Sequence, residues 1–377
     1  MSVDKFVRRF NPQFNNALLK SLLSNNKAFP SSVKSRVKNV ASKQGGWRTA
    51  QKYVASLLLI VSLPILAESV QRPALKSALA SRALLADSVR IGDGSRYLGV
   101  GIYGNIVYSD DSENWIQSNS PTQMLLTTVF FTDEKNGWAG GHDTLILHTK
   151  DGGENWEIQH EDPIPGGDIP KPVLDILFTD NKTGYAIGAY GLMLHTVNGG
   201  ESWQTLDTLG LYDRLEALEL EPEPNFNYFI PYGDKILIVG ELGTILLFDP
   251  AATTDEERWG IIDSPYEGTF FGAKQVSSGD LYIYGLRGNI YRSSDNMQTW
   301  QKIQTDVIAN VYGCIELAGG KLVFLASSGT ILALNSGGTT TEKLPYTGFD
   351  TLVSGQIISG NKTLLFGTRG VQIFDVP

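Results

Sequence analysis

The stretch GWAGGHDTLILHTKDGGENW, residues 137–156, returns 47 residues later as GYAIGAYGLMLHTVNGGESW, residues 184–203. Both copies contain a large apolar residue, a glycine three positions on, a turn residue after three more, and then an apolar run. The same core occurs seven times, and its first small residue is Gly101, Gly141, Gly188, Gly240, Gly285, Ala326 or Gly367. Because neighbouring copies start 40 to 52 residues apart, the chain is built from a repeated supersecondary unit.

Each copy predicts four short strands. In the second copy, apolar runs alternate with turns rich in Asp, Asn and Gly, and glycine supplies the positive φ that tight turns need. Four-stranded units of this length are typical of propeller blades. We therefore expect an all-β, seven-bladed β-propeller of four-stranded blades. The blades are expected near residues 87–119, 125–160, 173–206, 225–262, 269–304, 310–345 and 350–377.

The last copy ends at Pro377 after its third strand, so a closed ring needs an outer strand from elsewhere. We expect the segment Val70 to Leu85 to supply this strand and to close the ring by joining the two termini. The alternative is a helix from Leu75 to Leu85 lying over the ring, which the sequence ALKSALASRALL also permits.

The charge is divided between two parts of the chain. Residues 1–52 contain eleven Lys and Arg and one Asp, a net charge of +10, whereas the remainder carries −19. The next fifteen residues, Tyr53 to Ala67, carry no charge and are short for a membrane span, which needs about 20 residues. A basic arm, a short apolar run and a small residue indicate an export signal cleaved after Ala67. An uncleaved anchor and a buried helix are the alternatives.

These features predict a basic arm with a signal over residues 1–67 and the propeller over residues 68–377, exported to the periplasm. The thylakoid lumen is the alternative destination, because the arm is also poor in acids, as transit peptides are. An acidic propeller should repel nucleic acid, whose binding depends on Lys and Arg at phosphates. We expect no nucleic-acid partner.

Four copies end in a further pattern: SDDSENW, TKDGGENW, TVNGGESW and SSDNMQTW. They resemble the Asp-box of bacterial neuraminidase repeats. In such a turn, the Asp or Asn side chain caps backbone N–H groups and the Trp holds the outer strand. We expect a structural role for the four pairs, Asp111 and Trp115, Asp151 and Trp156, Asn198 and Trp203, and Asp295 and Trp300.

Combined with the glycine core, these boxes closely resemble the photosystem II assembly/stability factor family of seven-bladed propellers. The segments DSPYEGTFFG (263–272) and YGLRGNIYRS (284–293) add to the resemblance, which is nearest to the family's exported proteobacterial homologues. It implies a non-enzymatic assembly or stability factor for a membrane protein complex. An accessory protein of an efflux-type transporter is the alternative, and a carbohydrate-binding or sialidase-like propeller is the third possibility.

The sequence predicts no catalytic residue, no metal site and no cofactor. His148 and His195 occupy the same position of two different copies, so we expect them on separate blades as ordinary strand residues. Cys314, the only cysteine, lies in an apolar run and is expected to pack as a small hydrophobe. Arg90 and Ile91 are followed by glycine rather than by the proline of the sialidase motif.

We expect a partner to bind where turns and inter-blade loops share one face of the ring. Tyr103, Tyr190, Arg287 and Arg369 occupy equivalent turn tips, and Tyr and Arg are enriched in binding hot spots. Long loops are expected over residues 160–172, 206–224 and 263–268, with a short helix over Asp213 to Leu220. The expected partner is a membrane protein or membrane-complex subunit on the extracytoplasmic side, bound by a monomer.

Overall fold

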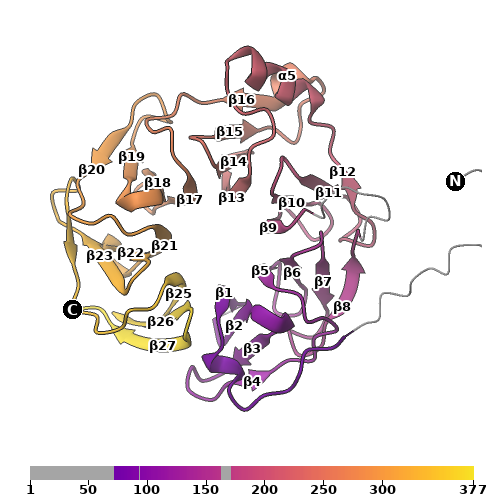
Figure 1. Ribbon diagram of the computed structural model, residues 1–377, viewed down its shortest axis with the longest axis vertical. Coiled ribbons are helices and arrows are strands. Elements are labelled where there is room, and N and C mark those ends of the chain that lie inside the picture. The colour runs from indigo at the N-terminus through magenta and orange to yellow at the C-terminus, as the bar shows by residue number, and fades with distance from the viewer. Residues whose placement is uncertain (1–71, 93, 163–170) are drawn as a thin grey trace, which may run out of the picture. The chain divides into compact units, whose positions relative to one another are not determined.

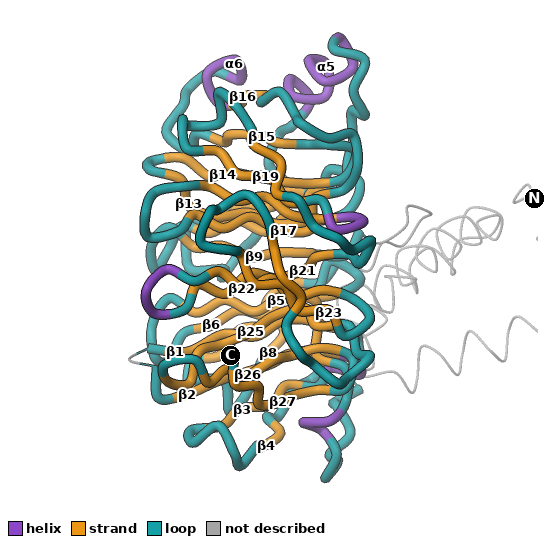
Figure 2. Tube along the Cα trace, turned by 90° about the vertical axis from the view of Figure 1, so that its left-hand side faces the viewer, coloured by secondary structure: helices purple, strands orange, loops and turns teal. Residues whose placement is uncertain are grey.

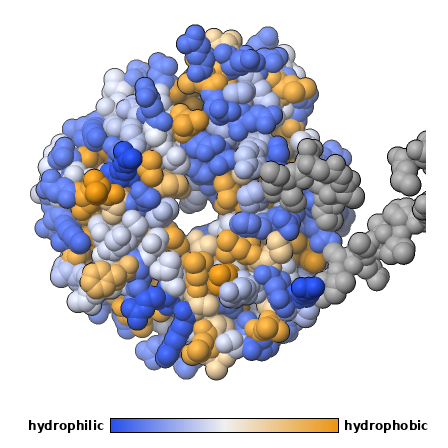
Figure 3. All heavy atoms as spheres, in the orientation of Figure 1, coloured by the Kyte–Doolittle hydropathy of each residue, from blue (hydrophilic) through white to orange (hydrophobic). Residues whose placement is uncertain are grey.

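The computed structural model describes residues 72–92, 94–162 and 171–377, and the chain from residue 71 onward forms a compact unit by itself. This unit is a ring of seven antiparallel sheets around a central opening (Figure 1 and Figure 3). Seen from the side, the strands run between the two faces of the ring, and loops with short helices lie at both faces (Figure 2). The predicted seven-bladed β-propeller is confirmed. The predicted arm and signal lie outside the described residues.

Each sheet is one blade, with its strands in chain order. Blade 1 contains β1 (Leu85–Ile91), β2 (Arg96–Gly101), β3 (Ile106–Ser109) and β4 (Ile116–Gln117). Blade 2 contains β5 (Leu126–Phe131), β6 (Gly137–Gly141), β7 (Ile146–Thr149) and β8 (Glu157–His160). Blade 3 contains β9 (Val173–Phe178), β10 (Gly184–Gly188), β11 (Met193–Thr196) and β12 (Gln204–Thr205). Blade 4 contains β13 (Phe226–Tyr232), β14 (Lys235–Gly240), β15 (Ile245–Phe248) and β16 (Trp259–Ile261).

Blade 5 contains β17 (Phe270–Gln275), β18 (Leu281–Gly285), β19 (Ile290–Ser293) and β20 (Gln301–Ile303). Blade 6 contains β21 (Val311–Glu316), β22 (Leu322–Ala326), β23 (Thr330–Leu334) and β24 (Thr341–Lys343). Blade 7 has three strands, β25 (Leu352–Ser359), β26 (Lys362–Gly367) and β27 (Gly370–Asp375). The short helices are η1 (Ala80–Arg82), η2 (Ile102–Gly104), η3 (Leu286–Gly288), η4 (Ala318–Gly320), α5 (Leu209–Ala217) and α6 (Asp255–Arg258). No helix in the described part of the chain has the length and apolar character needed to cross a membrane.

The recurring first glycine reflects a close approach of two backbone segments within a blade. A Cβ atom on Gly188 would lie 2.0 Å from the carbonyl oxygen of Pro172, and one on Gly285 would lie 2.0 Å from that of Thr269. Each carbonyl group belongs to the residue immediately before the first strand of the same blade. The glycine three residues later is needed for a different reason. Gly191, for example, has a φ of 64°, in the left-handed region that glycine adopts without strain. Steric constraints on the backbone therefore explain why both glycines recur in the repeats.

Seven hydrophobic clusters hold the ring together, one at each boundary between neighbouring blades. The cluster between blades 1 and 2, for example, brings Leu98 of β2 against Leu126 of β5 and Trp156. All buried members of the seven clusters lie within residues 80–376. The described residues of the ring therefore form a hydrophobic core at every boundary between blades.

The boundary between blades 7 and 1 is covered by the described part of the predicted closing segment. Residues 72–84 form no strand beside β27; they carry the short helix η1, which packs against β27, β3 and β4. Ala74 N–H donates to Ser120 O at 3.0 Å, and Lys76 Nζ donates to Gln117 O at 2.7 Å. These bonds hold residues 74–76 along blade 1, and η1 follows them to contact β27. Residues 70 and 71 of the predicted closing segment lie outside the described residues.

Side-chain packing and polar bonds join the two end blades instead. Ala80, Leu85 and Tyr97 pack against Leu364 and Phe366 across the boundary. The alternative helix over Leu75 to Leu85 is reduced to the single turn of η1.

Blade 1 also bonds blade 7 directly. Gln356 Nε2 donates to Ser88 O at 3.0 Å, and the hydroxyls of Ser88 and Ser354 are 2.7 Å apart.

The loop between blades 3 and 4 contains the predicted short helix. This helix, α5, begins at Leu209, four residues earlier than predicted, and ends at Ala217, three residues earlier than predicted. Its Leu211 and Leu215 are buried at the boundary between these blades.

Candidate binding face

The turns between second and third strands form the tips of one face, which we call the tip face. The N–H of the third tip residue bonds a carbonyl of the following inter-blade loop in several blades: Gly104 to Met124, Gly191 to Pro224, Gly243 to Gly268, and Gly329 to Asp350. These bonds place the tips and the inter-blade loops together. The four residues predicted to bind a partner, Tyr103, Tyr190, Arg287 and Arg369, all lie at these tips.

Three of these four residues have an unfavourable backbone conformation. Tyr103, Tyr190 and Arg287 have φ values of 60°, 54° and 57°, where bulky residues are uncommon. The same holds for Leu242, the equivalent residue of blade 4, whose φ is 52°. Glycine or asparagine would fit these turns at lower cost. Bulky side chains at strained positions are typical of functional surfaces.

The bulky tips are exposed. Tyr103 is 70 % exposed, Leu242 55 % and Tyr190 50 %, so none of them contributes a full side chain to the core. Their backbones are nevertheless fixed, because Tyr190 N–H donates to Asn225 Oδ1 at 2.8 Å and Arg287 N–H donates to Asn310 Oδ1 at 3.1 Å. The side chains are presented to solvent from a rigid support.

Arg369 lies beside a buried carboxylate. Its Nε is 3.6 Å from Oδ1 of Asp350, whose side chain is 5 % exposed, while the Arg369 side chain is 71 % exposed. Tyr346 OH and Gln372 Nε2 each donate to Asp350 Oδ2 at 2.8 Å. Burial, together with the hydrogen bond to Asp350, raises the pKa of Tyr346 to about 12. Asp350 therefore has several donors of its own, and Arg369 keeps most of its surface for an external group.

The central opening contains a cavity of about 760 Å³ lined by the first strands of the blades. Its wall includes two carboxyl groups, Asp87 of β1 and Asp175 of β9, with Thr128 of β5 between them. Each carboxylate accepts a backbone N–H from the next blade, Val129 to Asp87 at 3.0 Å and Phe229 to Asp175 at 3.1 Å. These carboxyl groups join neighbouring blades at the inner strands.

Burial raises the pKa of Asp175 to about 8 and that of Asp87 to about 6. The backbone bonds act in the opposite direction but are outweighed by the loss of water. We did not predict these carboxyl groups from the sequence. In the sequence, each of them appears only as a polar residue at the third position of a largely apolar first strand. The residue type at this position differs from blade to blade, so the repeat does not mark it.

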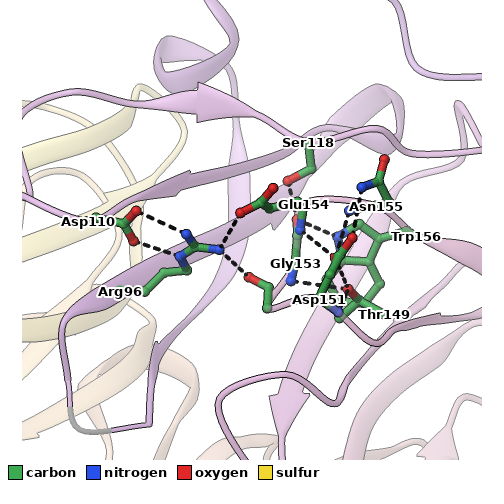
Figure 4. A network of polar contacts seen from close by, with 10 residues as sticks. Arg96, Asp110, Ser118, Thr149, Asp151, Gly153, Glu154, Asn155 and Trp156 are labelled. Carbon is green, nitrogen blue, oxygen red and sulfur yellow. Dashed lines mark hydrogen bonds and ion pairs between the residues drawn. The ribbon is translucent and has the colours of Figure 1, made fainter.

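The Asp-boxes cap turns on the face opposite the tip face. In blade 2, Asp151 Oδ1 accepts the N–H groups of Glu154 and Asn155, each at 3.0 Å, and Trp156 packs into the core behind the turn (Figure 4). Asp111 and Asp295 cap their turns in the same way, and Asn198 does so in blade 3. Hydrogen bonds from Asn114 and Thr299, respectively, hold the pKa of Asp111 and of Asp295 below its usual range.

Arg96 of β2 connects the blade 2 box to blade 1 (Figure 4). Its guanidinium binds Asp110 through Nε at 2.6 Å and Nη2 at 3.0 Å, while Nη1 donates to Gly152 O at 3.0 Å and to Glu154 Oε1 at 3.3 Å. The guanidinium also lies over the ring of Tyr108, 4.4 Å from its centroid. The boxes, spread over four blades, thus support the ring and do not converge on a common site.

The remaining candidates for chemistry are dispersed. His148 of β7 and His195 of β11 lie on separate blades; His148 stacks on Trp138, and burial lowers its pKa. Cys314 of β21 lies at the wall of the central cavity, where burial raises the pKa of its thiol to about 12. Within residues 72–92, 94–162 and 171–377, no three His, Cys, Asp or Glu side chains are grouped so that they could hold a metal ion.

The ring, its Asp-box turns and its rigid tips define a seven-bladed β-propeller built as a scaffold for exposed loops. The sequence matches the family model of the photosynthesis system II assembly factor YCF48 over residues 107–217 and 166–341, together more than half of the chain. The chain belongs to this family, whose members are assembly factors. No curated protein matches the sequence.

Solved structures share the fold. A YCF48 bound to a D1 peptide is 17 % identical with a TM-score of 0.59, and the match covers 81 % of this chain and 99 % of that one. YCF48 from Cyanidioschyzon merolae is 15 % identical with a TM-score of 0.59, covering 78 % and 95 % of the two chains. The WD40 propeller domain of Doa1 is 12 % identical with a TM-score of 0.57, covering 81 % and 96 %. At these identities the likeness establishes the fold.

Proposed function

We propose that this protein is an exported, non-enzymatic assembly factor that holds an extracytoplasmic segment of a membrane-complex subunit on its tip face. The observation that carries the proposal is the set of bulky tips, Tyr103, Tyr190 and Arg287, held at left-handed φ and exposed to solvent. Family membership supports an assembly role, and a solved YCF48 is in complex with a D1 peptide.

The chemistry of the tip face fits a peptide ligand. Tyrosine offers a large apolar surface with a hydroxyl group, and arginine offers a planar set of donors for carboxylate or backbone oxygens. Two of each lie around the ring at equivalent positions, so an extended segment can contact several blades at once. A rigid display of this kind lowers the entropy lost on binding.

A capture experiment from detergent-solubilised membranes tests the proposal. The double variant Arg287→Glu/Arg369→Glu should reduce capture of a membrane protein by about tenfold or more, because it reverses two charges at the tips. The matched control is Lys182→Glu/Lys343→Glu, which makes the same charge change at exposed positions in the blade 3 turn and in β24.

Cross-linked peptides then identify the bound segment. An extracytoplasmic loop or terminus of a photosystem subunit supports the proposal, and a transporter subunit favours the accessory-protein alternative. Equal capture by the wild type and the Arg287→Glu/Arg369→Glu variant would falsify the role of the tip face. Binding to a glycan array without protein capture would favour a carbohydrate-binding propeller.

A further inference from the structure

The tip face is divided into two sectors of opposite charge. The first, which we call the basic crescent, comprises the tips of blades 5, 6, 7 and 1 and the segments between them: residues 72–84, 102–104, 286–288, 304–310, 327–329, 344–351 and 368–370. It contains five cations, Arg72, Lys76, Arg82, Arg287 and Arg369, and two acids, Asp306 and the buried Asp350. The net charge of the crescent is therefore 5 − 2 = +3.

The rest of the tip face, which we call the acidic arc, covers blades 2 to 4. Its described segments are residues 142–144, 161–162, 171–172, 189–191, 206–225, 241–243 and 262–269. They contain twelve Asp and Glu against Lys171 and Arg214, a net charge of 2 − 12 = −10. The crescent is therefore positively charged, whereas the protein as a whole has a net charge of −9.

The crescent also presents the most exposed large apolar side chains of the described residues. Phe349 is 90 % exposed and Ile308 is 87 % exposed, and Leu75 and Tyr103 follow in the same sector with 77 % and 70 %. Their backbones are held firmly: Gly329 N–H donates to the carbonyl next to Phe349, and Ser327 N–H donates to Asn310 O, two residues after Ile308. Single apolar side chains projecting from fixed loops, with cations between them, are suited to a membrane interface.

The chain enters the ring at this sector. Gln123 Nε2 donates to Pro73 O at 3.0 Å and Ala74 N–H donates to Ser120 O, in the inter-blade loop that follows blade 1. Four residues separate Ala67, at the end of the apolar stretch, from Arg72, so the two Cα atoms lie at most about 18 Å apart along the chain.

We propose that the basic crescent docks on the surface of a bilayer containing anionic lipid. The cations meet the lipid phosphates, each contributing about 1 kcal/mol near a charged surface, while Phe349, Ile308 and Tyr103 enter the interface. The acidic arc is repelled by the same surface. This inference does not depend on the proposed function, since it concerns lipid alone.

Vesicle flotation tests the proposal with residues 68–377, which contain all seven core clusters. The ring should float with phosphatidylcholine vesicles containing about 30 % phosphatidylglycerol and much less with pure phosphatidylcholine. Ile308→Ser/Phe349→Ser should weaken the binding about tenfold, because both side chains are exposed and their loss removes only interfacial contacts. Arg82→Gln/Arg287→Gln should weaken it similarly and reduce its dependence on salt.

The matched control is Ile116→Ser/Val197→Ser, which removes two exposed apolar side chains outside the crescent and should bind like the wild type. Circular dichroism melts establish that each variant is folded. The inference is wrong if the wild type does not bind anionic vesicles, if it binds neutral vesicles equally well, or if the crescent variants bind as tightly as the control. Loss of protein capture with retained vesicle binding would contradict the proposed function and leave this inference standing.

Discussion

Thr128 of β5 donates its hydroxyl to Asp175 of β9, with Oγ1 and Oδ1 2.9 Å apart, across the boundary between blades 2 and 3. The same hydroxyl lies 3.4 Å from Oδ2 of Asp87 in blade 1. A hydroxyl has one proton, so it cannot satisfy two carboxylates at once. When Asp175 is protonated, it can donate to Thr128, which is then free to donate to Asp87. Protonation therefore completes a chain of bonds through three blades.

The first prediction concerns pH. The pKa of Asp175 is raised from 3.8 to about 8 by burial, so the folded state binds more protons than the unfolded state between these values. The stability linked to Asp175 is fully present below pH 4 and is lost as the pH rises through about 8. We expect the free energy of unfolding to fall by about 2 kcal/mol or more between pH 5 and pH 8.

Urea unfolding of residues 68–377 across this pH range checks the prediction. Asp175→Asn should flatten the pH dependence, although it costs stability at pH 5 because the amide nitrogen faces an N–H donor. Asp234→Asn, at an exposed turn residue, should retain the wild-type slope. A slope that is the same in all three proteins would contradict the assignment.

The second prediction concerns the clamp at Arg96. Arg96→Gln should lower the free energy of unfolding by about 1–2 kcal/mol, because it releases Asp110 and the Gly152 carbonyl of the neighbouring blade. Arg96→Lys should recover less than half of this loss, since an ammonium group cannot reproduce the planar fork or the contact with the Tyr108 ring. Thermal melts measure both. Arg258→Gln, which breaks a single ion pair with Asp255 three residues away in the same blade, should have little effect.

The third prediction concerns the blade 2 Asp-box. Asp151→Ala should destabilise the ring by about 1–2 kcal/mol, because the turn loses its acceptor for two backbone N–H groups. Asp151→Asn should be milder, since Asn198 already caps the blade 3 turn through its Oδ1 atom. Chemical denaturation of both variants provides the comparison, and an equal loss for Ala and Asn would show that charge, not the hydrogen bonds, matters.

The ring could be predicted because its determinants are local. Gly188 marks a close approach of two backbone segments and Gly191 marks a left-handed turn, both inside one blade. The fold of each blade can therefore be predicted from its own repeat. Closure was harder, because the sequence of residues 74–85 permits strand or helix and the contacts of η1 with β27 decide between them. The link between Asp87 and Asp175 through Thr128 was not predictable either, since the three side chains come from three different blades.

The turn positions of the proposed binding residues could be predicted, but their backbone conformation could not. The repeat register gives the tips of Tyr103 and Arg287, whereas their left-handed φ values and the division of charge across the face emerge only from the structure. The exposed Phe349 and Ile308 were also missed, because an apolar residue in a loop carries no periodic signal of its exposure.

The last prediction separates binding from stability at the tips. Tyr103→Gly/Tyr190→Gly should leave the melting temperature unchanged or raise it, because glycine relieves two left-handed backbones at a cost of about 1 kcal/mol or less each in unfolded-state entropy. The same variant should capture the membrane partner at least several-fold less well, since it removes two exposed aromatic side chains. Asp143→Gly, at the equivalent tip of blade 2 with a φ of 60°, should relieve similar strain without loss of capture. If the tyrosine variant melts at a clearly lower temperature, the two side chains serve the fold, and their exposure at strained positions needs an explanation other than partner binding.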